Sequence, residues 1–323
     1  MGLTESESFE YVVLQHYQHK GMFARAGLID ILIKNLREYS EKSNLTIKAQ
    51  QFDLNKNEVI ATLQIAIVAH IMMFIEDLAV ICKSISEGNI GYYKYLDKPG
   101  DQDLGEVISN FYSEIESASD ETLSKILSYT DVNDCEFVLE IEREIISKIR
   151  RQMIEKARAF LNRVIMFRAN HIKIFRRYKH AGFPILLAQQ VPSDIKAYEQ
   201  FQFASLGLTS REEPAGEIVP LPYSAKAIES YENLKKDIFS FLGNVITYKL
   251  ICIERKVHGL FPNNNNLWGL VLSEDEKKVL DNVWERFNAK FPVPEGQTPN
   301  EVITYTEVLR WYEDIENTSK RVL

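Results

Sequence analysis

The sequence predicts a mainly α-helical protein, an elongated helical bundle around one long helix with a small antiparallel β appendage. Three observations support this fold class. The run 135–181 contains neither proline nor glycine, so nothing in it interrupts a helix. The run 58–87 is apolar on nearly every side, which is typical of a central buried helix. Between 183 and 222, short β-like runs alternate with prolines and loops, which indicates an edge-type sheet.

The run 135–181 sets the scale of the molecule. At 1.5 Å per residue, a helix of this length is roughly 70 Å long, so other elements must pack along it. Gly182 and Pro184 supply the stop, because glycine takes the left-handed cap and proline cannot continue a helix. Its apolar residues recur at helical spacing: Leu139, Ile146, Ile149, Met153, Phe160, Val164, Phe167, Ile174 and Tyr178.

Charge on this helix is asymmetric, with glutamates at its start and cations through the rest. The helix dipole acts only in the terminal turns and does not account for a whole basic half. Two anionic partners remain open: the acid-rich stretch 101–121 of the same chain or another subunit, or an external polyanion such as RNA, DNA or a nucleotide. The cations that we assign to polyanion binding are Arg163, Arg168, Lys173, Arg176, Arg177 and Lys179.

Before the long helix we expect a helix over 10–39 with a kink near Gly21, then a short strand over 45–48. The core helix 58–87 carries Gln64 and His70, which interrupt its apolar run before it reaches the length of a membrane span, so no integral membrane association is expected. Glu76 and Asp77 on this helix are expected to pair with the basic helix, and a role as catalytic carboxylates is the alternative. Two short acidic helices, 106–117 and 121–129, lead into the long helix.

After the long helix, strands are expected over 185–191, 198–208 and 217–221, followed by a second long helix over 224–258. The four asparagines at 263–266 indicate a domain boundary. Residues 1–262 then form the helical main body, with a β insertion at about 183–222. Residues 263–323 form a C-terminal helical hairpin packed on the body, with capping boxes that start helices over 274–290 and 299–317.

Composition restricts the function classes. The net charge of −8 argues against a protein whose whole surface binds nucleic acid, although a local basic face remains compatible with it. The three cysteines are far apart and lack metal or disulfide spacing, which is typical of reduced thiols in the cytoplasm. Phosphate loops, dinucleotide fingerprints, zinc-protease motifs and nucleophile elbows do not occur, so we expect no cofactor and no metal.

The chain resembles the HEPN-like helical families. The likeness lies in the sequence Phe-Ile-Glu-Asp at 74–77, in the end of the long helix at 175–182, and in the sheet and second long helix that follow. Active members of that group are ribonucleases that need no metal, in which a histidine and an arginine on one helix act on the 2′-hydroxyl and the scissile phosphate. The resemblance makes His180, Arg176 and His171 the catalytic candidates. Arg176 stands closer to His180 than the family spacing requires, so the resemblance more readily implies a binding module.

The sequence therefore predicts a non-catalytic helical module that binds a partner protein or a polyanion, RNA among them, through the basic half of the 135–181 helix. Two alternatives stay open at this point. One is a metal-independent ribonuclease of HEPN-like type. The other is a structural protein that forms homo-oligomers.

Overall fold

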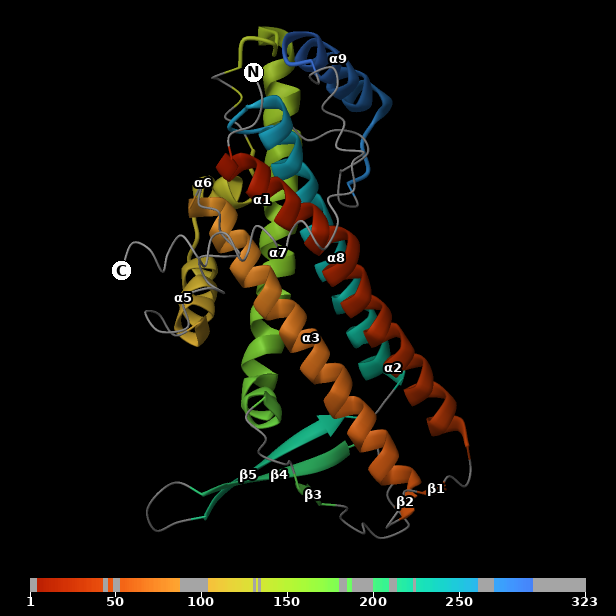
Figure 1. Cartoon of the computed structure of the whole chain (residues 1–323). Coiled ribbons are helices and arrows are strands. Elements are labelled where there is room, and N and C mark those ends of the chain that lie inside the picture. The colour runs from red at the N-terminus through yellow and green to blue at the C-terminus, as the bar shows by residue number, and fades with distance from the viewer. Residues whose placement is uncertain are drawn as a thin grey trace, which may run out of the picture.

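The computed structural model describes residues 5–42, 46–48, 53–87, 104–129, 132, 135–179, 185–187, 200–208, 214–222, 225–260 and 270–292. Within these residues the chain is mainly helical, which confirms the predicted fold class at that level (Figure 1). The long helices lie side by side along one axis and bury a continuous apolar core between them.

The first long segment is helical but has three parts: α1 (Glu5–His16), a π-helical stretch η1 (Tyr17–Met22) and α2 (Phe23–Glu41). The irregularity falls where the sequence predicted a kink at Gly21. A Cβ at Gly21 would lie 2.8 Å from a ring carbon of Tyr17, so the glycine lets that ring lie against the backbone. Strands β1 (Thr46–Lys48) and β2 (Asp53–Asn55) pair antiparallel before the next helix.

Helix α3 (Lys56–Glu87) is the centre of the bundle. Side chains on several of its faces are almost fully buried, among them Ile67, Val68, Ala69 and Phe74. By length and composition, Glu58–Ser86 is the one described helix that could cross a membrane, and 72% of its most apolar window is buried inside the protein. Helices α5 (Leu104–Glu116) and α6 (Asp120–Ile126) pack beside α3 and lead toward the longest helix, α7 (Glu140–Lys179).

Helix α8 (Ala225–Arg255) runs antiparallel to α1 and α2 along their whole length. Paired side chains fix this register. The hydroxyl of Tyr11 donates to Glu254 at 2.6 Å near one end, and Arg37 forms an ion pair with Glu232 at 2.5 Å near the other. Because these contacts join residues far apart in sequence, they hold the first and last parts of the bundle together.

Between α7 and α8 the chain forms strands β3 (Ile185–Leu187), β4 (Gln200–Leu208) and β5 (Pro214–Pro222). β4 lies in the middle and pairs antiparallel with both neighbours. The prolines at both ends of β5 fit a strand at the edge of a sheet, because proline cannot donate to a further neighbour.

Helix α9 (Glu274–Lys290) begins with the predicted capping box of Ser273 and Glu276. It packs against the start of α7 around a separate apolar cluster that includes Ile146, Leu280 and Val283. The division into a main body and a C-terminal hairpin stays a prediction. Its second helix, 299–317, lies outside the described residues.

Candidate polyanion-binding end of helix α7

The buried face of α7 holds the helix in the bundle and so decides which of its cations reach solvent. Ile149, Phe160, Val164 and Phe175 are almost fully buried on this face. Because a helix presents its remaining positions to other neighbours or to water, the cations divide into those that meet another helix and those that do not.

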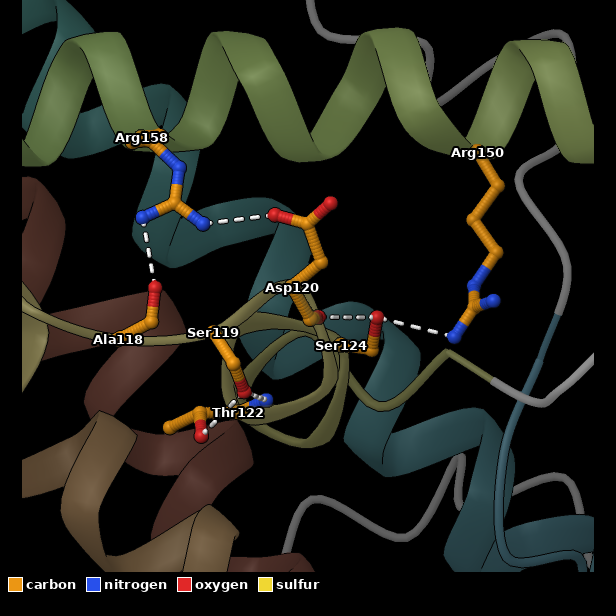
Figure 2. A network of polar contacts seen from close by, with 7 residues as sticks. All are labelled: Ala118, Ser119, Asp120, Thr122, Ser124, Arg150 and Arg158. Atoms are coloured by element: carbon orange, nitrogen blue, oxygen red, sulfur yellow. Dashed lines mark hydrogen bonds and ion pairs between the residues drawn. The ribbon is translucent and has the colours of Figure 1, made fainter.

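Three cations in the first half of α7 bind neighbouring elements of the same chain: Lys148, Arg150 and Arg158. Lys148 forms an ion pair with Glu276 of α9 at 2.8 Å. Arg158 donates to Asp120 of α6 and to the carbonyl of Ala118, each at 2.7 Å (Figure 2). These contacts join α7 to α6 and α9, so this part of the helix has an architectural role.

Figure 2 also shows Arg150 reaching the same short helix α6 from one side, while Arg158 reaches it from the other. Arg150 donates to the hydroxyl of Ser124 at 3.0 Å, and that hydroxyl in turn donates to the carbonyl of Asp120 at 2.7 Å. Ser119 caps α6 by accepting from the amide of Thr122 at 3.2 Å. The acid-rich stretch predicted as an internal partner therefore does bind α7, through Asp120.

Arg163 joins α7 to the second long helix, α8. It binds Asp237 of α8 at 2.6 Å, and its side chain is 56% exposed. The acid lies 74 residues further along the chain, outside the acid-rich stretch that the sequence offered as a partner. Arg163 therefore has an internal carboxylate beside it already and contributes less uncancelled charge to the surface.

Arg168 is half buried between α7 and α5. Its guanidinium lies over the ring of Tyr112, 5.3 Å from the ring centre, and stands 3.5 Å from the hydroxyl of Ser109. Burial lowers the pKa of Arg168, and the like charge of Arg176 lowers it further, while Tyr112 and Glu76 oppose this change. The guanidinium of Arg168 is thus directed toward α5.

Lys173 and Arg176 are exposed near the carboxyl end of α7. Arg177 and Lys179 belong to the same helix, but their side chains lie outside the described residues, as does all of His180. Lys173 and Arg176 lie further along α7 than Lys148, Arg158 and Arg163, which pair with α9, α6 and α8.

His171 is held by its own helix. Its Nδ1 lies 2.8 Å from the carbonyl of Phe167, and its ring stacks on the Phe167 ring at 4.1 Å between centres. Burial lowers the pKa of His171, so the neutral ring is favoured near neutral pH. In that form Nδ1 donates to the carbonyl, and Nε2 is the remaining acceptor. Arg168, the nearest preceding arginine, turns instead toward α5.

A second polar cluster, absent from the sequence prediction, lies on α3. Asp77 accepts from Tyr17 of η1 and from Arg25 of α2, each at 2.9 Å. Asp77 was expected to pair with the basic helix, and this expectation is wrong because α2, not α7, covers that face of α3. Burial raises the pKa of Asp77, and burial lowers the pKa of His70, with Arg25 adding to the second effect.

Within the described part of the chain, histidine, cysteine and acidic side chains nowhere gather in groups of three that could hold a metal ion. Comparison with known protein families, with curated proteins and with solved structures found no match to this chain.

Proposed function

We propose that this chain is a non-catalytic helical module that binds a polyanion, RNA for example, through the carboxyl end of α7. The observation that supports this most is the exposure of Arg176 near the end of α7, further along the helix than the cations that pair with α9, α6 and α8. A phosphate bound at this end of the helix would accept charge-assisted hydrogen bonds from the Arg176 guanidinium.

The division of charge along α7 supports the same proposal. Lys148, Arg158 and Arg163 have carboxylates of the same chain as partners, so they stabilise the bundle. Lys173 and Arg176 lie on the exposed surface further along the helix, where the sequence adds Arg177 and Lys179. A helix dipole is complemented by one or two charges in its last turn, so this series of cations exceeds what capping requires.

The proposal also covers the role of the neighbouring strands and the compartment in which the protein acts. The strands β3–β5 follow α7 directly, and in this proposal they form a small appendage beside the binding surface. With a net charge of −8, most of the surface repels nucleic acid, which restricts binding to this local face. The module is proposed to act in the cytoplasm, in keeping with its three buried cysteines, which form no disulfide.

The direct test is the affinity for a fluorescently labelled single-stranded RNA, measured by anisotropy at low salt. Arg176→Ala is expected to weaken binding about three- to tenfold, because one exposed phosphate contact is lost. Lys148→Ala is the matched control: it removes an exposed cation from the same helix, at the end that α9 occupies. Its affinity should equal that of the unaltered chain.

The RNA recovered from this assay separates the alternatives. Intact RNA with binding that depends on Arg176 supports the proposal. RNA cleaved by the metal-free chain would overturn its non-catalytic part in favour of the ribonuclease. Equal losses for Arg176→Ala and Lys148→Ala, or no binding at all, would overturn the assignment of the surface.

A further inference from the structure

Helix α9 packs on the start of α7 around an apolar cluster that is distinct from the main core. Ile146 of α7 and Leu280 and Val283 of α9 are fully buried there, and Cys135 lies in the same cluster, called the α9 cluster below. The main core takes over further along α7, from Met153 onward. Figure 1 shows α9 beside α7 at the end of the bundle that lies away from strands β3–β5.

The amino end of α7 is capped by a glutamate of its own first turn. The residue before the helix is Leu139, whose side chain has no oxygen that could accept from the first amides. Glu142 accepts from the Leu139 amide at 3.0 Å, which is one half of a capping box. Glu142 is buried, and Arg286 of α9 forms an ion pair with it and donates to the carbonyl of Phe137 at 2.8 Å. The cap of α7 therefore depends on a cation of α9.

The amino end of α9 has the reciprocal arrangement. One carboxylate oxygen of Glu276 accepts from the Ser273 amide at 2.8 Å and completes the capping box of α9. The other oxygen accepts from Lys148 of α7, also at 2.8 Å. The hydrogen bond from Lys148 and the backbone cap lower the pKa of Glu276 to about 2, so the carboxylate is charged at neutral pH. The cap of α9 therefore depends on a cation of α7.

Each helix thus supplies the cation that holds the capping glutamate of the other. When α9 leaves α7, Glu142 loses Arg286. In the same step Glu276 loses Lys148. The first amides of both helices then lose well-placed acceptors, because a capping glutamate without its cation is free to turn to water. Undocking and uncapping are therefore one event, and this makes the transition cooperative.

Contacts with the main bundle are found at the end of α9. Phe287 is the buried residue of α9 that belongs to the main core. Arg255 of α8 lies over its ring, 5.0 Å from the ring centre, and donates to Asn288 at 2.5 Å and to the carbonyl of Phe291 at 3.1 Å. The α9 cluster itself is small beside the main core, so opening it exposes less apolar surface than global unfolding does.

We propose that α9 and the start of α7, up to Ile149, open and close as one unit while the rest of the bundle stays folded. The two capping glutamates and their cations, Arg286 and Lys148, are the latch of this unit. Opening exposes the α9 cluster to solvent, and with it the thiol of Cys135. The unit is separate from the proposed polyanion-binding surface, because Arg176 lies about 42 Å further along α7 than Lys148.

The native cysteines of the full chain report this opening. Cys135 lies in the α9 cluster and Cys82 lies in the main core on α3, so each thiol monitors one part of the molecule. Their rates of labelling by N-ethylmaleimide are measured by mass spectrometry. The proposal predicts that Cys135 reacts about tenfold or more faster than Cys82 in native buffer. Its rate should also rise less steeply with urea at low concentration, because local opening exposes less surface than global unfolding.

Two substitutions remove the latch from opposite sides. Arg286→Ala should speed the labelling of Cys135 about tenfold or more, because it leaves Glu142 buried without its cation. Lys148→Ala should speed it about threefold, because this pair is more exposed. Lys277→Ala is the matched control. It removes an exposed cation of α9 whose ion pair with Glu274 lies within the same helix, so the rate should not change.

Hydrogen exchange tests the reciprocity of the latch. Arg286→Ala should speed exchange of the first amides of α9, although the substitution lies at the other end of that helix. Lys148→Ala should likewise speed exchange of the first amides of α7. A merely local loss of contact would change exchange beside the substituted residue and leave the distant helix start as it was.

Three results would overturn the proposal. The first is an equal labelling rate and an equal urea dependence for Cys135 and Cys82, since both thiols would then react only on global unfolding. The second is exchange that changes only beside each substitution. The third is an effect of Lys277→Ala as large as that of Lys148→Ala. If Arg286→Ala does not fold, the urea dependence of the two thiols in the unaltered chain still decides.

Discussion

Removal of Arg25 from the Asp77 cluster is the most informative test of how the core is held together. Arg25 donates from Nε to Asp77 at 2.9 Å, and the two side chains are only 26% and 13% exposed. Arg25→Ala leaves the carboxylate with the hydroxyl of Tyr17 as its remaining partner in the cluster. A buried ion pair broken from one side costs about 3–5 kcal/mol, and partial access to water reduces the expected loss here to about 2–3 kcal/mol at pH 7.

The loss should depend on pH, with a sign that follows from burial. Burial already raises the pKa of Asp77 in the folded chain, and Arg25 acts in the opposite direction. Without Arg25 the folded pKa rises further, so ionised Asp77 destabilises the variant at pH 7. As the pH falls through that raised pKa, the carboxyl takes up a proton in the folded chain and the penalty is relieved.

The assay is urea denaturation followed by circular dichroism at about pH 7 and about pH 5. Arg25→Ala should lose less stability relative to the unaltered chain at the lower pH. Adding Asp77→Asn to Arg25→Ala should recover part of the loss at pH 7, because an amide carries no charge to desolvate. An equal loss at both pH values, without recovery in the double variant, would refute the assignment of Asp77 as a buried charge held by Arg25.

Two further predictions test local packing and capping. Gly21→Ala should lower the free energy of unfolding by about 1–3 kcal/mol, because its Cβ would meet the Tyr17 ring at 2.8 Å. Gly243→Ala is the control, because its Cβ would meet its nearest neighbour at an ordinary 3.6 Å, and it should raise the free energy of unfolding by about 0.5–1 kcal/mol. If urea melts showed that both substitutions stabilise the chain, the packing of Tyr17 on Gly21 would be contradicted. Glu276→Gln should cost about 0.5–1.5 kcal/mol at pH 7. The hydrogen bond from Lys148 and the backbone cap lower the pKa of Glu276 to about 2. The stabilisation by ionised Glu276 is complete above its unfolded pKa and is lost as the pH falls toward about 2. The free energies of unfolding of the unaltered chain and of Glu276→Gln should therefore converge at low pH. A difference that stays constant with pH would exclude the effect.

Much of the helical architecture is predictable because helix ends obey local rules. The capping box at Ser273 places the start of α9 where the structure has it, and the lack of proline and glycine predicts α7 to within a few residues of its observed bounds. Gly21 indicated an irregularity, but the choice of a π-helical stretch over a kink depends on where the Tyr17 ring packs. That contact is tertiary, so periodicity alone does not predict it.

The charges of the candidate site were harder to predict because ion pairs join residues that are distant in sequence. Asp120 lay in the stretch expected to bind α7, and it does bind Arg158. Asp237 gave no such signal, because in the sequence it is one of many polar residues of an amphipathic helix. Its pairing with Arg163 depends on how α8 packs beside α7. The partner of Asp77 depends likewise on which helix covers α3. Helix contacts, rather than composition, decide which cations of α7 stay available.

The proposed function requires positive charge at the carboxyl end of α7 that a polyanion can bind, and the salt dependence of RNA affinity tests this most directly. Phosphate contacts release counterions, so the logarithm of the binding constant should fall linearly with the logarithm of salt concentration. Arg176→Ala should reduce the steepness of that line by about 0.7, the value for one contact to a single strand, while Lys148→Ala should leave it unchanged. An affinity that does not vary with salt, or an identical slope for Arg176→Ala and the unaltered chain, would contradict the central claim.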